Sequence, residues 1–299
     1  MPATERASIE DELTPPFTVA IPRAQAAPFV FCSPHSGRVY PAAFLSSSRL
    51  DAHSLRKSED CYVDDLFSGV TDLGVPLIAA RFQRAYLDVN REPYELDPEL
   101  FEEPMPPYAN TQSVRVVGGL GTIARIVADG EEIYRNRLAL AVALERIDRL
   151  YKPFHGTLSG LLDATWRQFG IAVLIDCHSM PSASIGQPQS LRPDFVLGDR
   201  FGVSCDGRLT RFFREMLAGL GYEVQLNRPY AGGYITEHYG RPQRGLHALQ
   251  IEVNRSLYLN ETTLTRSRNF VRVKHDLTST VAQLFRELPN IMAWRTAAE

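Results

Sequence analysis

Apolar and polar positions along this chain predict strands and helices that follow one another. An unbroken apolar run at 171–175, within a predicted strand at 171–177, and a second apolar run at about 28–33 end abruptly in polar residues, and a third predicted strand at 246–253 ends in a carboxylate, an amide and a guanidinium. Such runs are typical of strands buried on both faces of a parallel sheet. Between them, apolar residues at helical spacing predict helices, the first at about 55–73. This alternation favours a single three-layer α/β domain.

The remaining elements continue this pattern. Further strands are predicted at 75–82, 194–197 and 222–226, and further helices at 131–170 (interrupted near 153–160), 207–220 and 261–288. Residues 1–26 are polar and contain Pro15, Pro16 and Pro22, so we interpret them as an extended lead-in with room for an edge strand. Residues 27–299 then form one domain. The proline-, acid- and glycine-rich segment 92–122 is interpreted as a long functional loop.

Composition narrows the class of protein. With 299 residues, 44% of them hydrophobic, the chain can bury a substantial core. A net charge of −3 argues against a nucleic-acid surface and against electrostatic attachment to a membrane. The four cysteines have no regular spacing, no signal-peptide pattern opens the chain, and no apolar run reaches the roughly 18 residues of a membrane span. We therefore expect a cytoplasmic protein whose cysteines are reduced.

Two histidines stand where a ligand site is expected. In open α/β sheets, ligands bind just outside the carboxyl ends of the strands. His35 and His178 each follow a predicted buried strand and lie among small residues. A hydrolytic zinc site typically has three ligands drawn from His, Asp and Glu, with one position left for water. The pair therefore indicates a metal site, although a loop histidine bonded to backbone groups is the alternative for either one.

The third ligand should be an acid, and segment 57–65 supplies several. Ser58 is a possible N-cap of the predicted helix, and acids in a first helical turn are favoured by the helix dipole. That role explains part of the acid cluster without a metal. Asp60 and Glu59 both reach the apolar face of this predicted helix, and helical spacing does not choose between them.

Other polar clusters could serve catalysis and substrate binding. Glu252 lies between two apolar strand residues and is a candidate general base, with an ion pair to Arg255 as the alternative. Asn90 beside Arg91 can bind a carboxylate through hydrogen bonds, although an arginine on a loop is more often simply solvated. The segment 232–240 is interpreted as a flexible loop that closes over a substrate, or as a glycine-rich hairpin.

Together these residues resemble the N-formylglutamate amidohydrolase family. The matching pieces, in the family's order between about 28 and 285, are Ser33–Gly37, Asp60 with Val63, Asp64 and Leu66, Asp88–Arg91, Asp176–Ser179, Gly233–Thr236 and Ile251–Asn254. The resemblance implies a fold similar to that of the zinc carboxypeptidases, with a mixed, mainly parallel sheet between helical layers. It also implies hydrolysis of N-formyl-L-glutamate, or of a close N-acyl amino acid, to the amino acid and formate or a similarly small acid.

The resemblance also implies roles for individual residues. Zinc, one ion per chain, would be held by His35, Asp60 and His178, with Glu252 as general base. Substrate contacts would come from Arg84 at the oxyanion, from Asn90 and Arg91 at a carboxylate, and from the hydroxyls of Tyr234 and Thr236. Family members that act in histidine breakdown carry a Trp-His pair after the aspartate, where this chain has Cys61-Tyr62. The physiological substrate therefore stays open.

Several alternatives remain at this point. Zinc, cobalt and manganese all accept these ligands. The enzyme could be another N-acyl amino acid deacylase or a carboxypeptidase-like metallohydrolase. A non-catalytic binding protein on the same fold is opposed by the intact His35, His178 and Glu252. A di-manganese ureohydrolase is disfavoured, because Asp176–His178 lacks the Asp-x-His-x-Asp density of such sites. In each enzymatic case the partner is a small molecule, and the oligomeric state is open.

Overall fold

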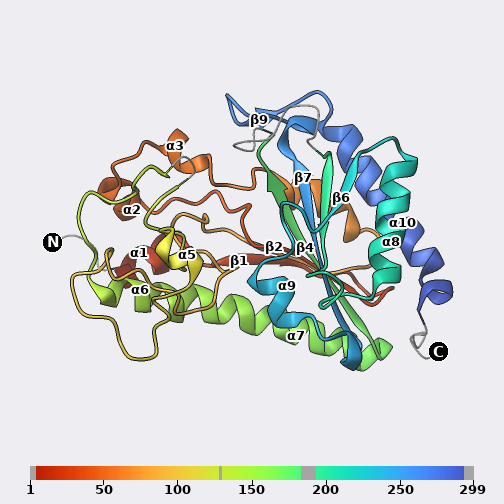
Figure 1. Cartoon of the computed structure of the whole chain (residues 1–299), viewed down its shortest axis with the longest axis horizontal. Coiled ribbons are helices and arrows are strands. Elements are labelled where there is room, and N and C mark those ends of the chain that lie inside the picture. Colours follow the sequence, from red (N-terminus) through yellow and green to blue (C-terminus); the bar gives the residue numbers. More distant parts are fainter. Residues whose placement is uncertain (1–4, 128–129, 183–192, 293–299) are drawn as a thin grey trace. The chain divides into compact units, whose positions relative to one another are not determined.

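A seven-stranded sheet organises the computed structural model, which describes residues 5–127, 130–182 and 193–292 (Figure 1). Its strand order is β1-β3-β2-β4-β7-β5-β6. The strands are β1 (Phe17–Ala20), β2 (Phe29–Ser33), β3 (Leu77–Ala80), β4 (Ala172–Met180), β5 (Phe195–Gly198), β6 (Val224–Leu226) and β7 (Leu246–Asn254). β4 runs parallel to both β2 and β7, whereas β5 is antiparallel to β7 and parallel to β6. The sheet is mixed and mostly parallel, as predicted.

Helices flank this sheet and confirm the predicted α/β class. The helices in the described parts of the chain are α1 (Glu5–Glu12), α2 (Ala42–Ser47), α3 (Ala52–Arg56), α4 (Val63–Phe67), α5 (Val114–Val117), α6 (Leu140–Arg146), α7 (Lys152–Phe169), α8 (Gly207–Gly219), α9 (Tyr234–Tyr239) and α10 (Phe270–Ile291). A short hairpin, β8 (Leu259–Asn260) with β9 (Thr265–Arg266), precedes α10. No helix in the described parts of the chain is long and apolar enough to span a membrane.

The chain divides into two compact units. The first comprises 1–18, 34–59 and 79–157, and the second comprises 19–33, 60–78 and 158–299. In the second unit, α8 and α10 cover one face of the sheet and α9 lies against β4 and β7 on the other (Figure 1). The covered face carries the alternate apolar residues of the central strands, among them Val173, Ile175 and Cys177 of β4. Burial of this apolar face holds the unit together.

The first unit is built around a buried arginine. The Arg146 guanidinium on α6 lies 3.8 Å from the centre of the Tyr86 ring, and its Nε donates to Glu5 at 2.5 Å. Its terminal nitrogen also donates to the Tyr134 hydroxyl at 2.8 Å. Glu5 belongs to α1, so this contact anchors the helix that occupies part of the segment expected to be extended. The edge strand expected in that segment is β1.

Three other predicted elements differ from the observed ones. The helix expected from residue 131 begins at Leu140 and continues through a π-turn into α7 without the expected interruption. Pro153 closely follows the π-turn and, because it has no N–H, removes one backbone hydrogen bond from this continuous helix. The segment 232–240 forms α9 rather than a loop or a hairpin. The last helix begins at Phe270, because the hairpin uses the residues before it.

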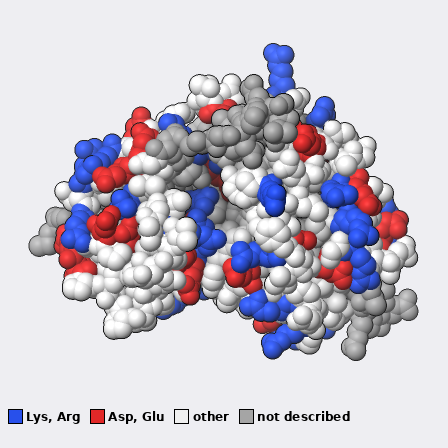
Figure 2. Space-filling model, in the orientation of Figure 1, with Lys and Arg blue, Asp and Glu red and all other residues white. Residues whose placement is uncertain are grey.

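Charged side chains of both signs are interspersed over the face drawn in Figure 2. Acidic and basic residues also pair along single helices, as Arg6 does with Glu10 and Lys152 with Asp148. Such exposed pairs contribute little to stability.

Candidate metal centre and active site

A row of buried polar side chains lies on one face of strands β4 and β7. Asp176 and His178 on β4 are the register partners of Gln250 and Glu252 on β7. Because side chains alternate along a strand, these four share a face, opposite to the apolar residues between them. All four are at most 6% exposed. His178 and Glu252 were expected at strand ends, but both lie within longer strands than predicted.

Ion pairs and hydrogen bonds connect the members of this polar row to one another and to neighbouring residues. The His178 ring contacts Asp176 through Nε2 at 2.9 Å and Asp60 through Nδ1 at 3.0 Å. Thr236 on α9 donates its hydroxyl to the other Asp176 oxygen at 3.2 Å. Burial acts to lower the pKa of His178, but the Asp176 carboxylate raises it, and the pKa lies well above its ordinary value. The imidazole is therefore oriented by carboxylates on both sides.

Asp60 comes from a turn rather than from a helix. The helix expected at 55–73 is broken into α3 and α4, and Tyr62 before α4 has a left-handed φ of 61°. Ser58 caps neither helix, since α3 is capped by Asp51 and α4 has no side-chain cap. In the turn, Asp60 is 1% exposed. The interpretation of its carboxylate as a first-turn helical acid is wrong.

Glu59, the other acid left open by the sequence, belongs to a different set of contacts. Its carboxylate accepts hydrogen bonds from the Tyr40 hydroxyl at 2.9 Å and from Arg56 Nε at 3.2 Å. Asp60, by contrast, faces His178. The geometry therefore groups Asp60 rather than Glu59 with the histidines.

His35 follows β2 and is held by a second carboxylate. Its Nε2 lies 2.7 Å from Asp88 Oδ1, and both side chains are buried. Gly37 makes the turn after it possible, because a Cβ there would lie 1.9 Å from the Phe82 carbonyl oxygen. Burial raises the pKa of Asp88, but Arg91, His35 and Arg84 lower it, and the net pKa lies well below its ordinary value. Asp88 is therefore an ionised partner for His35.

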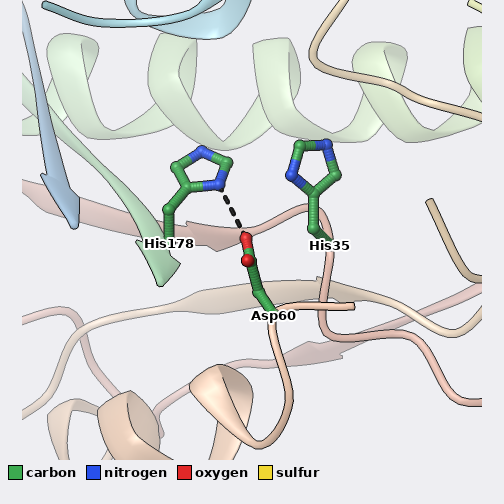
Figure 3. Close-up of side chains that lie close together, drawn as sticks. All are labelled: His35, Asp60 and His178. Atoms are coloured by element: carbon green, nitrogen blue, oxygen red, sulfur yellow. Dashed lines mark hydrogen bonds and ion pairs between the residues drawn. The ribbon is translucent and has the colours of Figure 1, made fainter. Parts of the chain in front are cut away.

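The side chains of His35, Asp60 and His178 converge (Figure 3). One ligand atom from each lies within 4.8 Å of the other two, and all three residues are buried. Two imidazoles and a carboxylate are a typical ligand set for catalytic zinc. A carboxylate partner on each imidazole, Asp88 and Asp176, is also typical of metal-binding histidines. These residues fit a metal ion and could hold one.

A sequence model of the N-formylglutamate amidohydrolase family matches residues 27–259. The chain belongs to this family. It is 31% identical over 238 residues to an N-formylglutamate deformylase of Pseudomonas putida, which covers 79% of this chain and 83% of that protein. It is 27% identical over 272 residues to an N-formylglutamate deformylase of Pseudomonas aeruginosa, and the match covers 89% of this chain and 93% of that protein.

The crystal structure of N-formylglutamate amidohydrolase from Ralstonia eutropha is also similar. The TM-score is 0.86 at 34% identity, covering 93% of this chain and 99% of that one. The predicted family and fold class are confirmed by these matches. Membership of this family also confirms the predicted enzyme class, that of amidohydrolases that act on the linear amide of a small molecule.

In this family member, the two arginines expected to bind substrate contact Asp88. Arg84 Nε lies 3.0 Å and an Arg91 terminal nitrogen 3.4 Å from Asp88 Oδ2. Arg91 is buried and also donates to the Leu120 and Asn90 carbonyls. Burial lowers the pKa of Arg91 to about 10, against the opposing effect of Asp88, so Arg91 stays charged at neutral pH. The Arg84 side chain is 31% exposed and is the more accessible of the two.

The two hydroxyl residues of the glycine-rich segment have different surroundings. Tyr234 opens α9 and stacks on His238, with ring centroids 5.0 Å apart. Thr236 is buried, and its contact with Asp176 makes it part of the support for His178. The sequence placed both on a loop, whereas a short helix presents them.

Sequence reasoning assigned no individual role to four residues that structure the site, Asp88, Asp176, Ser179 and Gln250. Asp88, Asp176 and Ser179 lie inside the family's matching pieces, and that position was the available signal. Gln250 donates to Glu252 Oε1 at 2.9 Å and accepts from the Gly233 N–H at 2.7 Å. Arg255, which the sequence offered as an alternative ion-pair partner of Glu252, contacts Asp60 at 3.3 Å. Nothing in the local pattern pointed to that long-range pair.

Proposed function

We propose that this chain hydrolyses N-formyl-L-glutamate, or a close N-acyl amino acid, in a metal-dependent reaction. Water adds to the acyl carbon, the C–N bond breaks, and formate and glutamate leave. The observation that carries the proposal is the buried group of His35, Asp60 and His178. The names of the similar Pseudomonas proteins, N-formylglutamate deformylases, support the choice of substrate.

The three ligands would be one carboxylate and two imidazoles. A zinc ion bound there would polarise the acyl carbonyl and make water a stronger nucleophile at neutral pH. Asp88 and Asp176 each contact the Nε2 of one histidine, and they fix the orientation of the two rings. Cobalt or manganese would also suit these ligands, and zinc is the metal we propose.

Glu252 would act as general base and then as general acid. It lies beside His178 in the sheet register and is 6% exposed, so its carboxylate belongs to the same buried polar row. It would take a proton from the attacking water and deliver it to the leaving amine nitrogen. The hydrogen bond from Gln250 holds one carboxylate oxygen, which supports a fixed orientation for both transfers.

Charged and hydroxyl groups would bind the substrate. Arg84 would stabilise the negative charge that develops on the carbonyl oxygen, and its partial exposure supports that role. Asn90 and Arg91 would hold a substrate carboxylate, with the Arg91 guanidinium already oriented by its carbonyl contacts. Tyr234 and Thr236 would supply hydroxyls from α9. We further propose that 27–299 act as one catalytic domain, which the family match over 27–259 supports.

A substrate panel tests this function. Initial rates would be measured for N-formyl-L-glutamate, N-formyl-L-aspartate, N-acetyl-L-glutamate and N-formyl-L-leucine, with release of the acid as the readout. The proposal expects the highest kcat/KM for N-formyl-L-glutamate and the lowest for the leucine compound, which lacks the second carboxylate. A preference for another acyl amino acid would move the substrate within the same reaction class. Metal binding without hydrolysis of any compound would favour the binding-protein alternative.

A further inference from the structure

The two oxygens of the Asp60 carboxylate have different surroundings. Oδ1 accepts hydrogen bonds from the Ser179 hydroxyl at 3.0 Å and from an Arg255 terminal nitrogen at 3.3 Å. Arg255 Nε also donates to the Ser179 hydroxyl oxygen at 3.1 Å, which closes a three-residue ring. Oδ2 faces the His178 ring at 3.0 Å. Oδ1 is therefore fixed by two hydrogen-bond donors, while Oδ2 is directed at the His178 ring.

The donors of this ring are fixed by the elements that carry them. Ser179 lies in β4, paired with Val253 of β7. Arg255 opens a 3-10 turn whose start is capped by Asn254, since the Asn254 side chain accepts from the Ser256 N–H at 3.1 Å. Asp60, Ser179 and Arg255 are all at most 6% exposed. Burying an arginine without a partner costs free energy, so Arg255 needs its contact with Asp60 at this buried position.

From this geometry we propose that Arg255 and Ser179 are positioning residues that make Asp60 a ligand through one oxygen. They occupy Oδ1, so the carboxylate can offer Oδ2 to a metal beside His178 without rotating. The inference rests on the proposed metal role of Asp60. Groups that orient a metal ligand typically contribute about 10- to 100-fold to metal affinity.

Arg255 also affects metal affinity through its charge, and this effect is opposite in sign to that of orienting Asp60. Its positive charge near the site disfavours a cation, so removing the charge alone would strengthen metal binding. Removing the orientation of Asp60 would weaken it. Ser179 carries no charge, so Ser179→Ala changes only the orientation. The pair of variants separates the two effects.

The experiment is a chelator-competition titration of Zn²⁺ into metal-free protein. We expect about 10- to 100-fold weaker binding by Ser179→Ala, and a smaller loss by Arg255→Met, an unbranched uncharged variant whose lost charge partly offsets the lost orientation. Arg272→Met is the control, because Arg272 is exposed on α10, where it lies 3.8 Å from Asp276 and 6.0 Å from the centre of the Tyr222 ring. It should bind Zn²⁺ as the wild type does. Should Arg255→Met fail to fold, Ser179→Ala, which loses one hydroxyl, still decides the question.

Cobalt provides a readout that a general loss of stability would not change. The visible absorption of bound Co²⁺ depends on its ligand geometry, and we expect it to change in both variants and to stay unchanged in the control. Wild-type Zn²⁺ affinity in both variants would overturn the inference and leave the proposed function standing. Tighter binding by Arg255→Met with no effect of Ser179→Ala would also overturn it. No Zn²⁺ binding by the wild type would overturn the metal function itself.

Discussion

Replacing Asp88 by asparagine tests whether this carboxylate holds the first unit together as well as orienting His35. The substitution keeps the shape of the side chain and removes its charge. In the wild type, Asp88 contacts His35 at 2.7 Å, Arg84 at 3.0 Å and Arg91 at 3.4 Å. Asparagine has one acceptor oxygen, so it can satisfy only part of these contacts.

The expected loss of stability follows from the burial of the partners. The Arg84 side chain is 31% exposed, so water compensates much of the loss of its ion pair with Asp88. The Arg91 side chain is only 9% exposed. Leaving a buried charge without its partner costs about 3–5 kcal/mol. Arg91 keeps its bonds to the Leu120 and Asn90 carbonyls, which places the expected loss near the lower end of that range. A loss of about 3 kcal/mol corresponds to roughly 6 °C in Tm.

Thermal unfolding of metal-free protein at pH 7 measures this loss. Asp97→Asn is a matched control, because Asp97 is a buried carboxylate of the same unit that pairs with Arg125 at 2.7 Å. Arg125 keeps a second partner, Glu99, at 3.2 Å, and its side chain is 25% exposed. We expect about 1 kcal/mol or less for this control. Equal losses for the two variants would refute the reasoning about Asp88.

Three further predictions concern catalysis and pH. Glu252→Gln should lower kcat by about 100-fold or more while metal content stays unchanged, and an unchanged kcat would remove Glu252 from the mechanism. Gln250→Met should lower kcat by about 10-fold with the metal retained, because it removes the donor to Glu252 and the acceptor for the Gly233 N–H. Burial raises the pKa of Tyr134 against the opposing effect of Arg146. Its contribution to stability is therefore present below its ordinary pKa of about 10 and lost as the pH rises further. The Tm gap between wild type and Tyr134→Phe should narrow between pH 9 and pH 11, and a constant gap would contradict this.

The hydrophobic pattern predicted the central strands well, because their apolar residues face a core that the pattern describes directly. Strands β2, β4 and β7 lie where the apolar runs are. The end of β4 was missed because the pattern assumes that polar residues leave a buried strand. His178 and Glu252 remain inside their strands, since Asp176, Asp60 and Gln250 satisfy them.

Long-range partners explain the differences around Asp60. The helix expected at 55–73 breaks where Asp60 turns inward to meet Ser179 and Arg255, which are far away in the sequence. Local spacing carries no information about such partners, so it also left Glu59 and Asp60 undecided. The pairing of Arg255 with Asp60 could not be predicted for the same reason. The specific roles of the substrate-binding residues, the absence of a nucleic-acid partner and the cytoplasmic location stay predictions.

Metal content measured together with formate release from N-formyl-L-glutamate, before and after chelation, tests the central claim most directly. The account predicts a single zinc ion per chain. It also predicts formate release that chelation abolishes and added zinc restores. Full activity in metal-free protein would contradict the metal-dependent mechanism. A chain that binds no metal and releases no formate would contradict the assignment of His35, Asp60 and His178 as ligands.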